Sequence, residues 1–336
     1  MKGFDLHRPA TVDEAVGLLS SAGLSARPLA GGTDLVAGVM RDHLVGAAMP
    51  YPSVLVDVAG LPEMDGISEV DGGVRIGAGV PLVEIAESSV IGRSWPMLAQ
   101  AAAQIASPEI RAVGTVGGNI AQRPRCWFFR SRDFDCIKKG GTICFAVKGD
   151  NRYNAILDGN ICFIVHPSDL GVALIALGAS ARIRSLRGER VVSFSSFFVS
   201  PAENLVAENV MEPDELLVDV FVPFVGEGVV QHWSKLNEKG GKTWDFALVS
   251  VGACARVVDG VWEDGRVVLG GVAPVPYQAR VVEEALVGRS VAEALPDALE
   301  ALRAVARPMR DNGFKLDLTL VVLEESLRTM AGLPAR

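Results

Sequence analysis

Four cysteines lie close together near the middle of the chain and could bind a metal centre. Cys126, Cys136, Cys144 and Cys162 follow the spacing C-x9-C-x7-C-x17-C. Four thiolates can hold a zinc ion or an iron–sulfur cluster. Structural zinc sites usually contain C-x2–4-C pairs, so this spacing weakens the zinc alternative and leaves it open. The fifth cysteine, Cys254, stands in an apolar run and is expected to be a core residue.

Basic side chains crowd the same segment of the chain. They are Arg123, Arg125, Arg130, Arg132, Lys138, Lys139, Lys148 and Arg152. A cluster held by four thiolates carries negative charge, so nearby cations would favour it and tune its reduction potential. The alternative is a basic surface loop with four free thiols, which is unfavourable because exposed cysteines are reactive. The composition of the segment therefore favours a metal centre.

Two glycine pairs could bind an anion. The first lies in Pro28-Leu-Ala-Gly-Gly-Thr-Asp-Leu35 and the second in Thr115-Val-Gly-Gly-Asn119. Glycines allow successive backbone N–H groups to turn toward one point, and a following helix would add its dipole, as a pyrophosphate site requires. Neither loop matches the nicotinamide-binding or P-loop pattern. A single Gly-Gly is usually only a turn, but two with Thr and Asp or Asn attached favour binding.

Other catalytic signals are absent from the sequence. His166, the histidine nearest the cysteines, precedes Pro167 and is expected to make a structural hydrogen bond rather than to ligate a metal. The sequence contains neither H-E-x-x-H nor G-x-S-x-G. Hydrolysis is therefore not indicated.

Length and composition limit the class of protein. The chain has 336 residues, of which 49% are hydrophobic and 21% charged, with a formal net charge of −8. Such a chain can bury a core, and its length predicts two or three domains. The negative charge argues against a nucleic-acid partner. No apolar run is long enough to span a membrane, and the N-terminus lacks the apolar core of a signal peptide, so we expect a cytoplasmic protein without disulfides.

Apolar patterns predict the elements that position these loops. A capping box at Thr11-Val-Asp-Glu14 precedes a helix, and the cysteine segment is followed by a helix at 169–176. Strands are predicted at 27–30, 53–58, 74–80, 180–193, 216–222, 247–257 and 266–269, and helices at 82–86 and 97–105. After Pro276 the pattern becomes helical. Strands followed by segregated helices indicate an α+β fold.

Together with Ser168-Asp169 and Gly270-Gly-Val-Ala-Pro274, the two glycine motifs resemble the FAD-binding subunits of the xanthine dehydrogenase family. This family includes the medium subunits of carbon monoxide dehydrogenase, aldehyde oxidoreductases and 4-hydroxybenzoyl-CoA reductase, and the resemblance covers nearly the whole chain. It implies an α+β, vanillyl-alcohol-oxidase-type FAD-binding fold. Two α+β subdomains, residues 1–56 and 57–204, would hold an extended FAD. A C-terminal α+β domain with an antiparallel sheet and helices, residues 205–336, would close over it.

The resemblance also implies which residues contact FAD. Both glycine motifs would line the pyrophosphate, through Pro28, Leu29, Ala30, Gly31, Gly32, Thr33, Asp34, Leu35, Thr115, Val116, Gly117, Gly118 and Asn119. Ile105 would contact the cofactor, and Asp169 would bind its polar chain. Leu217 and Lys235 would lie near the isoalloxazine ring. A cation at that position can stabilise the anionic reduced flavin.

One departure from the family's simpler members concerns the cysteines. Those members place the equivalent of Asp169 a short distance after the glycine motif, whereas 50 residues separate it from Asn119 here. The additional residues, about 122–165, resemble the insertion that carries a [4Fe–4S] cluster in 4-hydroxybenzoyl-CoA reductase and some bacterial aldehyde oxidoreductases. Arg125-Cys-Trp-Phe-Phe-Arg130 is similar to the aldehyde oxidoreductase version. The resemblance therefore implies Cys126, Cys136, Cys144 and Cys162 as cluster ligands.

The implied function is an electron-transfer subunit of a multi-subunit molybdenum hydroxylase or oxidoreductase. A large partner would carry the molybdenum cofactor and the substrate chemistry, and a small partner would carry [2Fe–2S] clusters. FAD and the [4Fe–4S] cluster would pass electrons between those clusters and an external acceptor. Two alternatives stay open: a stand-alone flavin dehydrogenase, for which no convincing base appears, and a zinc-stapled adaptor. Export to the periplasm beside a signal-bearing partner is the alternative to a cytoplasmic location.

Overall fold

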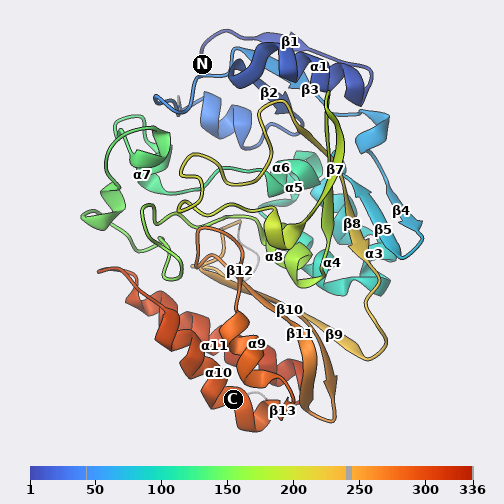
Figure 1. Cartoon of the computed structure of the whole chain (residues 1–336), viewed down its shortest axis with the longest axis vertical. Helices are drawn as coiled ribbons and strands as arrows, with labels where there is room; N and C mark the ends of the chain where they lie inside the picture. The colour runs from blue at the N-terminus through green and yellow to red at the C-terminus, as the bar shows by residue number, and fades with distance from the viewer. Residues whose placement is uncertain (43, 240–243, 335–336) are drawn as a thin grey trace.

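A computed structural model describes residues 1–42, 44–239 and 244–334 (Figure 1). Its N-terminal part is a three-stranded parallel sheet in the order β1-β3-β2, formed by β1 (Asp5–His7), β3 (Val54–Asp57) and β2 (Ala26–Leu29). Helix α1 (Val12–Ala22) packs on this sheet and begins at the predicted cap, where Thr11 Oγ1 accepts a hydrogen bond from the Glu14 N–H at 3.2 Å. Strand β2 leads directly into the first glycine motif.

A five-stranded antiparallel sheet follows, in the order β4-β5-β8-β6-β7. Its strands are β4 (Ile67–Val70), β5 (Gly73–Gly77), β8 (Leu216–Pro223), β6 (Ser180–Ser185) and β7 (Gly188–Ser193). The helices of this part are α2 (Leu82–Glu87), α3 (Ser89–Ser94), α4 (Pro96–Ala103), α5 (Pro108–Val113), α6 (Val116–Ile120) and α8 (Asp169–Ala176). Strand β8 lies beyond residue 204 but belongs to this sheet, and the domain boundaries stay predictions.

The C-terminal part combines an antiparallel sheet with three helices, as the predicted fold class requires. The sheet has the order β12-β11-β10-β9, with a short β13 (Arg289–Ser290) beside β11. Its strands are β9 (Val229–Leu236), β10 (Val249–Val258), β11 (Val261–Gly270) and β12 (Tyr277–Gln278). The helices, drawn in red in Figure 1, are α9 (Arg280–Leu286), α10 (Val291–Val305) and α11 (Gly313–Met330). Their apolar faces bury Leu286, Leu302 and Leu323 against this sheet.

Three apolar cores hold these parts together. The largest joins the first two sheets and their helices, and a second lies between the C-terminal sheet and α9, α10 and α11. A third, smaller core consists of Val39, Leu44, Met49, Phe129 and Cys136. The third core matters for the site, because it packs residues that follow the first glycine motif against residues of the cysteine segment.

The cysteine segment, residues 122–165, contains little regular structure. It forms the green lobe beside the N-terminal sheet in Figure 1, with only α7 (Trp127–Arg130), η4 (Ile137–Lys139) and η5 (Phe145–Val147). Lys138 and Lys139 are both 1% exposed, so polar contacts rather than a large apolar core order this lobe. Among the residues described here, no helix is long and apolar enough to cross a membrane.

Candidate functional site

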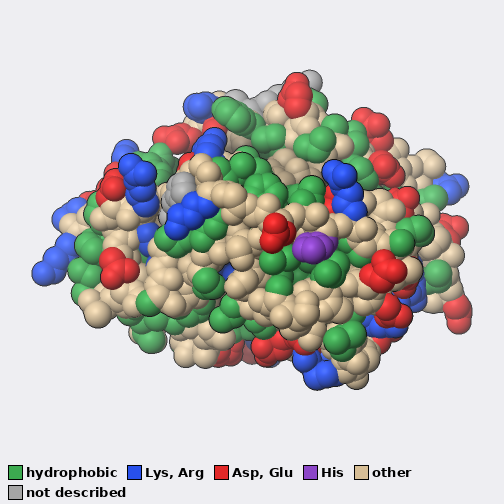
Figure 2. All heavy atoms as spheres, turned by 90° about the horizontal axis from the view of Figure 1, so that it is seen from above, with side chains coloured by type: hydrophobic (Ala, Val, Ile, Leu, Met, Phe, Trp, Pro, Cys, Tyr) green, Lys and Arg blue, Asp and Glu red, His purple; other side chains and the backbone are tan. Residues whose placement is uncertain are grey.

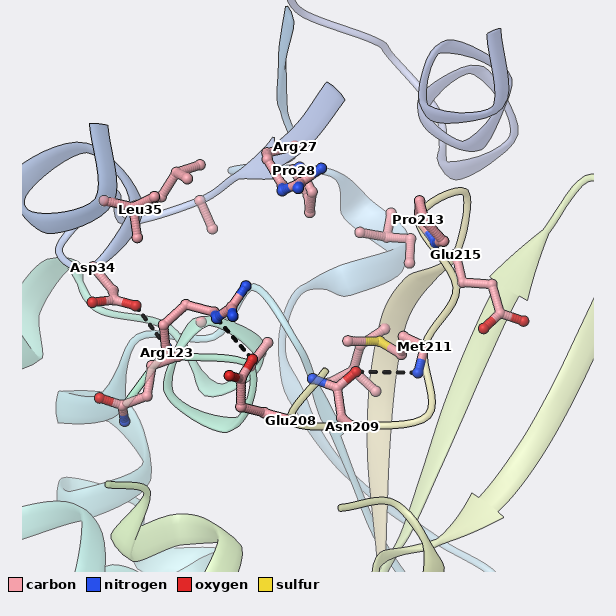
Figure 3. A pocket seen from close by; sticks show the side chains of 18 of the residues that line it. Arg27, Pro28, Asp34, Leu35, Arg123, Glu208, Asn209, Met211, Pro213 and Glu215 are labelled. Atoms are coloured by element: carbon pink, nitrogen blue, oxygen red, sulfur yellow. Dashed lines mark hydrogen bonds and ion pairs between the residues drawn. The ribbon is translucent and has the colours of Figure 1, made fainter. Parts of the chain in front are cut away.

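A cavity of about 580 Å³ opens where the two glycine motifs meet. Figure 3 shows Arg27 and Pro28 on one side, Arg123 and Glu208 opposite, and the chain around Met211 and Pro213 closing a third side. All eight residues of the first motif line it, together with Thr115, Gly117 and Gly118 of the second. Leu217, at the start of β8, lines it as well.

Gly31 allows the two glycine motifs to pack backbone against backbone. A Cβ atom at this position would lie 1.9 Å from the Val113 carbonyl oxygen and 3.0 Å from Gly114 Cα. Gly32 next to it has φ +67°, a left-handed conformation that L side chains rarely adopt. The first pair of glycines is therefore required by geometry, and the cavity exists because these loops approach so closely.

The two motifs differ in the backbone groups that they offer to a ligand. Within the described parts of the chain, the N–H groups of Gly31, Gly32 and Thr33 have no hydrogen-bond acceptor. In the second motif, the Gly117 N–H donates to the Ala78 carbonyl at 2.8 Å and the Gly118 N–H donates to Thr115 Oγ1 at 3.2 Å.

The prediction of a second cradle of free N–H groups is therefore wrong. Its physical reason is that Thr115 caps α6 and that the loop docks on the residues just after β5, Ala78 and Val80, which consumes the donors. The glycines of this motif provide instead a surface without side chains. Both helices that follow the motifs, η2 (Leu35–Met40) and α6, are short. In η2 the Ala37 and Val39 N–H groups donate five residues back, so it is a widened turn rather than the α-helix predicted.

The Asp34 carboxylate, at the wall of the cavity, is held by residues of the cysteine segment (Figure 3). Its Oδ1 accepts from Arg130 Nη2 at 2.7 Å and pairs with Arg125 Nη2 at 3.0 Å. Its Oδ2 accepts from the Arg123 N–H at 2.8 Å. The carboxylate is thus a structural anchor between two segments, a role that the motif alone did not indicate.

Two arginines at the cavity were missed as site residues. Arg27 lines it directly before the first motif, and burial, with the nearby Arg123, lowers its pKa. Arg123 Nε lies 2.8 Å from Glu208 Oε2, so its charge is already balanced. The position of Arg27 beside Pro28 was a usable signal. No such signal marked Glu208 in the sequence, because its partners Arg123 and Lys138 lie far from it along the chain.

Three other predicted residues gather behind the cavity rather than in it. Lys235 Nζ donates to Asp169 Oδ2 at 2.7 Å and to the Gln104 carbonyl, directly before Ile105, at 2.9 Å. Burial raises the pKa of the Asp169 carboxyl, and the charge of Lys235 and its hydrogen bond oppose that change. The ammonium is therefore fixed beside Ile105 by two acceptors.

Asn119 links this buried group to the glycine-lined cavity. Its Oδ1 accepts a hydrogen bond from Ser168 Oγ at 2.7 Å, and Ser168 caps α8, whose first residue is Asp169. Neither Asn119 nor Val116 lines the cavity itself, since both are buried. The predicted FAD residues thus form two neighbouring groups.

The four cysteines are brought into one region but not into a ligand set. The interaction between the Cys144 and Cys162 thiols lowers the pKa of Cys144 and raises the pKa of Cys162. Asn154 Nδ2 lies 3.8 Å from Cys126 Sγ, and burial raises the pKa of the Cys126 thiol. Cys136 is buried in the third core, against which Cys126 packs. Within the described residues, no three His, Cys, Asp or Glu side chains are placed to hold one metal ion.

Several cations of the segment already have protein partners. Lys138 Nζ lies 2.8 Å from Glu208 Oε1, Lys139 Nζ donates to the Ser131 carbonyl at 2.6 Å, and Arg152 pairs with Asp150 at 2.7 Å. These three cations therefore stabilise the fold of the segment through contacts with the protein. The expectation that they favour a cluster is weakened for them.

Two residues behave as their sequence context indicated. His166 Nδ1 accepts from the Ser168 N–H at 3.3 Å, and its ring meets Phe198 edge-on at 4.6 Å. Burial lowers its pKa to about 3, so it is a neutral structural histidine. Cys254 lies on β10 and is partly buried, and burial raises its pKa to about 11.

Comparison with known proteins identifies the family. Residues 2–225 match the FAD binding domain in molybdopterin dehydrogenase, and residues 240–330 match the CO dehydrogenase flavoprotein C-terminal domain. The chain belongs to the FAD-binding subunits of the xanthine and carbon monoxide dehydrogenase family. This confirms the resemblance drawn from the glycine motifs. It also establishes FAD as the cofactor and an oxidoreductase subunit as the class.

Individual relatives match this FAD-binding subunit over nearly its full length. It is 32% identical to the aldehyde oxidoreductase FAD-binding subunit PaoB of Escherichia coli K12, over 94% of both chains. It is 27% identical to the carbon monoxide dehydrogenase medium chain of Hydrogenophaga pseudoflava, over 92% of this chain and 88% of that one. A carbon monoxide dehydrogenase structure from that organism superposes with a TM-score of 0.77 at 26% identity, covering 98% of each chain. Quinoline 2-oxidoreductase from Pseudomonas putida 86, at 23% identity and TM-score 0.74 over 99% of each chain, shares the fold.

Proposed function

We propose that this chain is the electron-transferring FAD subunit of a molybdenum hydroxylase-type complex. The observation that carries the proposal is the cavity in which both glycine motifs meet, on a chain that matches the FAD-binding family. FAD supplies redox chemistry that exchanges one or two electrons at a time. The chain itself supplies position, charge and shielding from water.

The cofactor's pyrophosphate is proposed to lie against the first glycine motif. The N–H groups of Gly31, Gly32 and Thr33 are the available donors, and the Arg27 guanidinium offers positive charge. Thr115, Gly117 and Gly118 would form the opposing wall, and Leu217 would contact an apolar part of FAD. The close approach that Gly31 permits brings both motifs to this one site.

The flavin ring is proposed to lie toward Ile105, Asp169 and Lys235. Lys235 Nζ has two fixed acceptors, so its position would not depend on the redox state of the flavin. An ammonium held there would stabilise negative charge that develops on the reduced ring. Asn119 and Ser168 would connect this end of the site to the pyrophosphate end.

We further propose that Cys126, Cys136, Cys144 and Cys162 hold a [4Fe–4S] cluster. The chemistry of the donors fits, since four thiols lie in one lobe and Cys144 already contacts Cys162. Within the described residues the thiols do not surround a single metal ion. A [4Fe–4S] cluster does not require that arrangement, because each of the four thiolates would bind a different iron. The cluster would relay electrons between FAD and a neighbouring redox centre.

The proposed partners are a large subunit with the molybdenum cofactor and a small subunit with [2Fe–2S] clusters. Relatives support this, since one is called the medium chain of carbon monoxide dehydrogenase, and the solved carbon monoxide dehydrogenase at 26% identity is described as an enzyme with a molybdenum cofactor whose Mo-pyranopterin moiety is missing. Substrate oxidation or reduction would then occur outside this chain, and an external acceptor would exchange electrons with FAD. The proposed location is the cytoplasm, unless a signal-bearing partner exports the complex.

Anaerobic purification through an affinity tag on this chain tests the proposed complex. Molybdenum, FAD and iron are expected to elute together. Electrons from a substrate that is oxidised at molybdenum should reduce the flavin and bleach its absorbance. A molybdenum-free preparation that oxidises a substrate on its own flavin would contradict the proposal and favour a stand-alone dehydrogenase.

Serine substitution tests the four cysteines one at a time. We expect about four irons and four acid-labile sulfides per wild-type chain. Cys136→Ser should lose most of the iron, because serine is a poor ligand for the cluster, and it should still bind FAD supplied in excess. The matched control is Cys254→Ser, at the cysteine outside the segment, which should retain the iron. If the purified wild type contains zinc and no acid-labile sulfide, the cluster is overturned and the zinc-stapled adaptor is favoured.

A further inference from the structure

We propose that Arg130 of the cysteine segment is a positioning residue for FAD. It holds Asp34 of the first glycine motif, so the affinity for FAD depends on the folded state of the cysteine segment. The inference rests on the proposed FAD site. Its link to the cluster rests on the proposed cysteine ligands.

The contact between Arg130 and Asp34 is partly buried and rich in hydrogen bonds. Both side chains are 14% exposed, and Arg130 Nη2 lies 2.7 Å from Asp34 Oδ1. The same nitrogen donates to the Arg123 carbonyl at 2.7 Å, and Arg130 Nε donates to the Pro124 carbonyl at 2.7 Å. The guanidinium therefore fixes Asp34 and the chain before α7 in one arrangement.

Asp34 transmits this constraint to the ligand-facing backbone. Its own carbonyl accepts the Gly38 and Val39 N–H groups at 3.1 Å and 3.0 Å, so it starts η2. Asp34 also directly follows the free N–H groups of Gly31, Gly32 and Thr33. A side chain that fixes Asp34 thereby limits where those donors can point. The affinity for an anion depends on such preorganisation.

Close packing shows that the contact is built into the fold. A Cβ atom on Gly38 would lie 2.6 Å from Arg130 Nη1, so the guanidinium packs directly against η2. A Cβ atom on Gly46 would lie 2.1 Å from the Lys139 carbonyl oxygen. Segment 35–49, of which the structure describes residues 35–42 and 44–49, thus packs on the cysteine segment at two glycines, Gly38 and Gly46.

The proposed cluster ligands belong to the same structure. Cys126 directly precedes α7, and its carbonyl accepts the Arg130 N–H at 2.9 Å. Cys136 and Phe129 share the third core with Val39, Leu44 and Met49. Ordering Cys126 and Cys136 around a cluster would therefore order Arg130 and segment 35–49. Because binding linkage is reciprocal, FAD would in turn favour the cluster-bound form.

The primary test measures the dissociation constant for FAD by flavin fluorescence on apoprotein. Arg130→Met is expected to raise the constant at least about tenfold, since it leaves a buried carboxylate with fewer partners. Arg130→Lys should give an intermediate value, because one charge is kept while the forked contacts are lost. The control Arg132→Met removes an exposed arginine of the same segment, 3.8 Å from Asp133, and should stay within about twofold.

Folding is checked separately by circular dichroism and thermal unfolding. If Arg130 were only structural, Arg130→Met would lower the melting temperature but, while folded, bind FAD like Arg132→Met. That equality would overturn the inference. The visible circular dichroism of bound FAD adds a spectroscopic signature, which should change for Arg130→Met and not for Arg132→Met.

Iron removal tests the link to the cluster. Chelation of iron from the wild type should raise the FAD dissociation constant, whereas the constant of Arg130→Met should hardly respond. If the wild type binds iron but its dissociation constant for FAD does not change when the iron is removed, the link is overturned and the proposed cluster is retained. A wild type that binds no iron would overturn the cluster, and the comparison of Arg130→Met with Arg132→Met would still decide the role of Arg130.

Discussion

The glycine-lined cavity and the cysteine segment are neighbours that are built in opposite ways. The cavity is made by backbone at the ends of β2 and α5, where Gly31 lies against the Val113 carbonyl. The cysteine segment is ordered by side chains. Lys138 and Lys139 are buried in it, and among the described residues its thiols do not surround a single metal ion. Metal binding by side chains is coupled to folding, so a cluster would stabilise the folded cysteine segment, whereas close backbone packing already forms the cavity. Figure 2 shows the N-terminal face, where charges of both signs alternate with apolar side chains.

The largest expected effect would break the backbone-built site. Gly31→Val should abolish FAD binding and destabilise the chain by more than about 3 kcal/mol, because its Cβ would overlap the Val113 carbonyl oxygen. Gly17→Ala is the matched control, since nothing lies within 4 Å of the new Cβ in α1. Urea unfolding and the flavin absorbance of purified protein measure both effects. Normal FAD content in Gly31→Val would contradict the close approach of the two motifs.

A second change tests the buried group behind the cavity. Lys235→Met should cost about 3 kcal/mol of unfolding free energy, because it leaves the Asp169 carboxylate buried without its cation. Lys235 and Asp169 are only 3% and 8% exposed. The double variant with Asp169→Asn should recover part of that loss, as urea unfolding would record. Strictly additive losses would argue against a direct interaction.

A smaller effect, on the pH dependence of stability, comes from His166, which directly follows the cysteine segment. Its folded pKa of about 3 lies below the ordinary value of 6.5, so the unfolded chain takes up a proton that the folded chain does not. Stability contributed by neutral His166 is thus present above pH 6.5 and is lost as the pH falls toward 3. Between pH 6.5 and 5 the loss should approach about 2 kcal/mol.

His166→Asn removes this titration while keeping an acceptor for the Ser168 N–H. Its unfolding free energy should therefore fall less on acidification than that of the wild type. His7→Asn, at an exposed histidine of β1, is the control and should follow the wild type. Identical pH profiles for His166→Asn and the wild type would show that His166 is not buried in its neutral form.

Local patterns in the sequence predicted the elements and the backbone-built site better than the side-chain contacts. The helix expected at 169–176 is α8, and the glycine motifs meet as they do because short repeats of Gly encode close backbone approach. The partners of Asp34 could not be predicted, since Arg125 and Arg130 lie far along the chain. The hydrogen bonds that occupy the Gly117 and Gly118 N–H groups could not be predicted either, because they depend on how the loop packs in the folded chain.

The central claim is that the side-chain-built region completes its geometry around a [4Fe–4S] cluster beside an FAD site. The most direct measurement is the Mössbauer spectrum of wild-type chain purified anaerobically from cells grown on ⁵⁷Fe, with FAD quantified on the same sample. The account predicts one FAD per chain and iron in a single [4Fe–4S] population that Cys136→Ser lacks. Bound FAD with no cluster iron, or with zinc in its place, would contradict it.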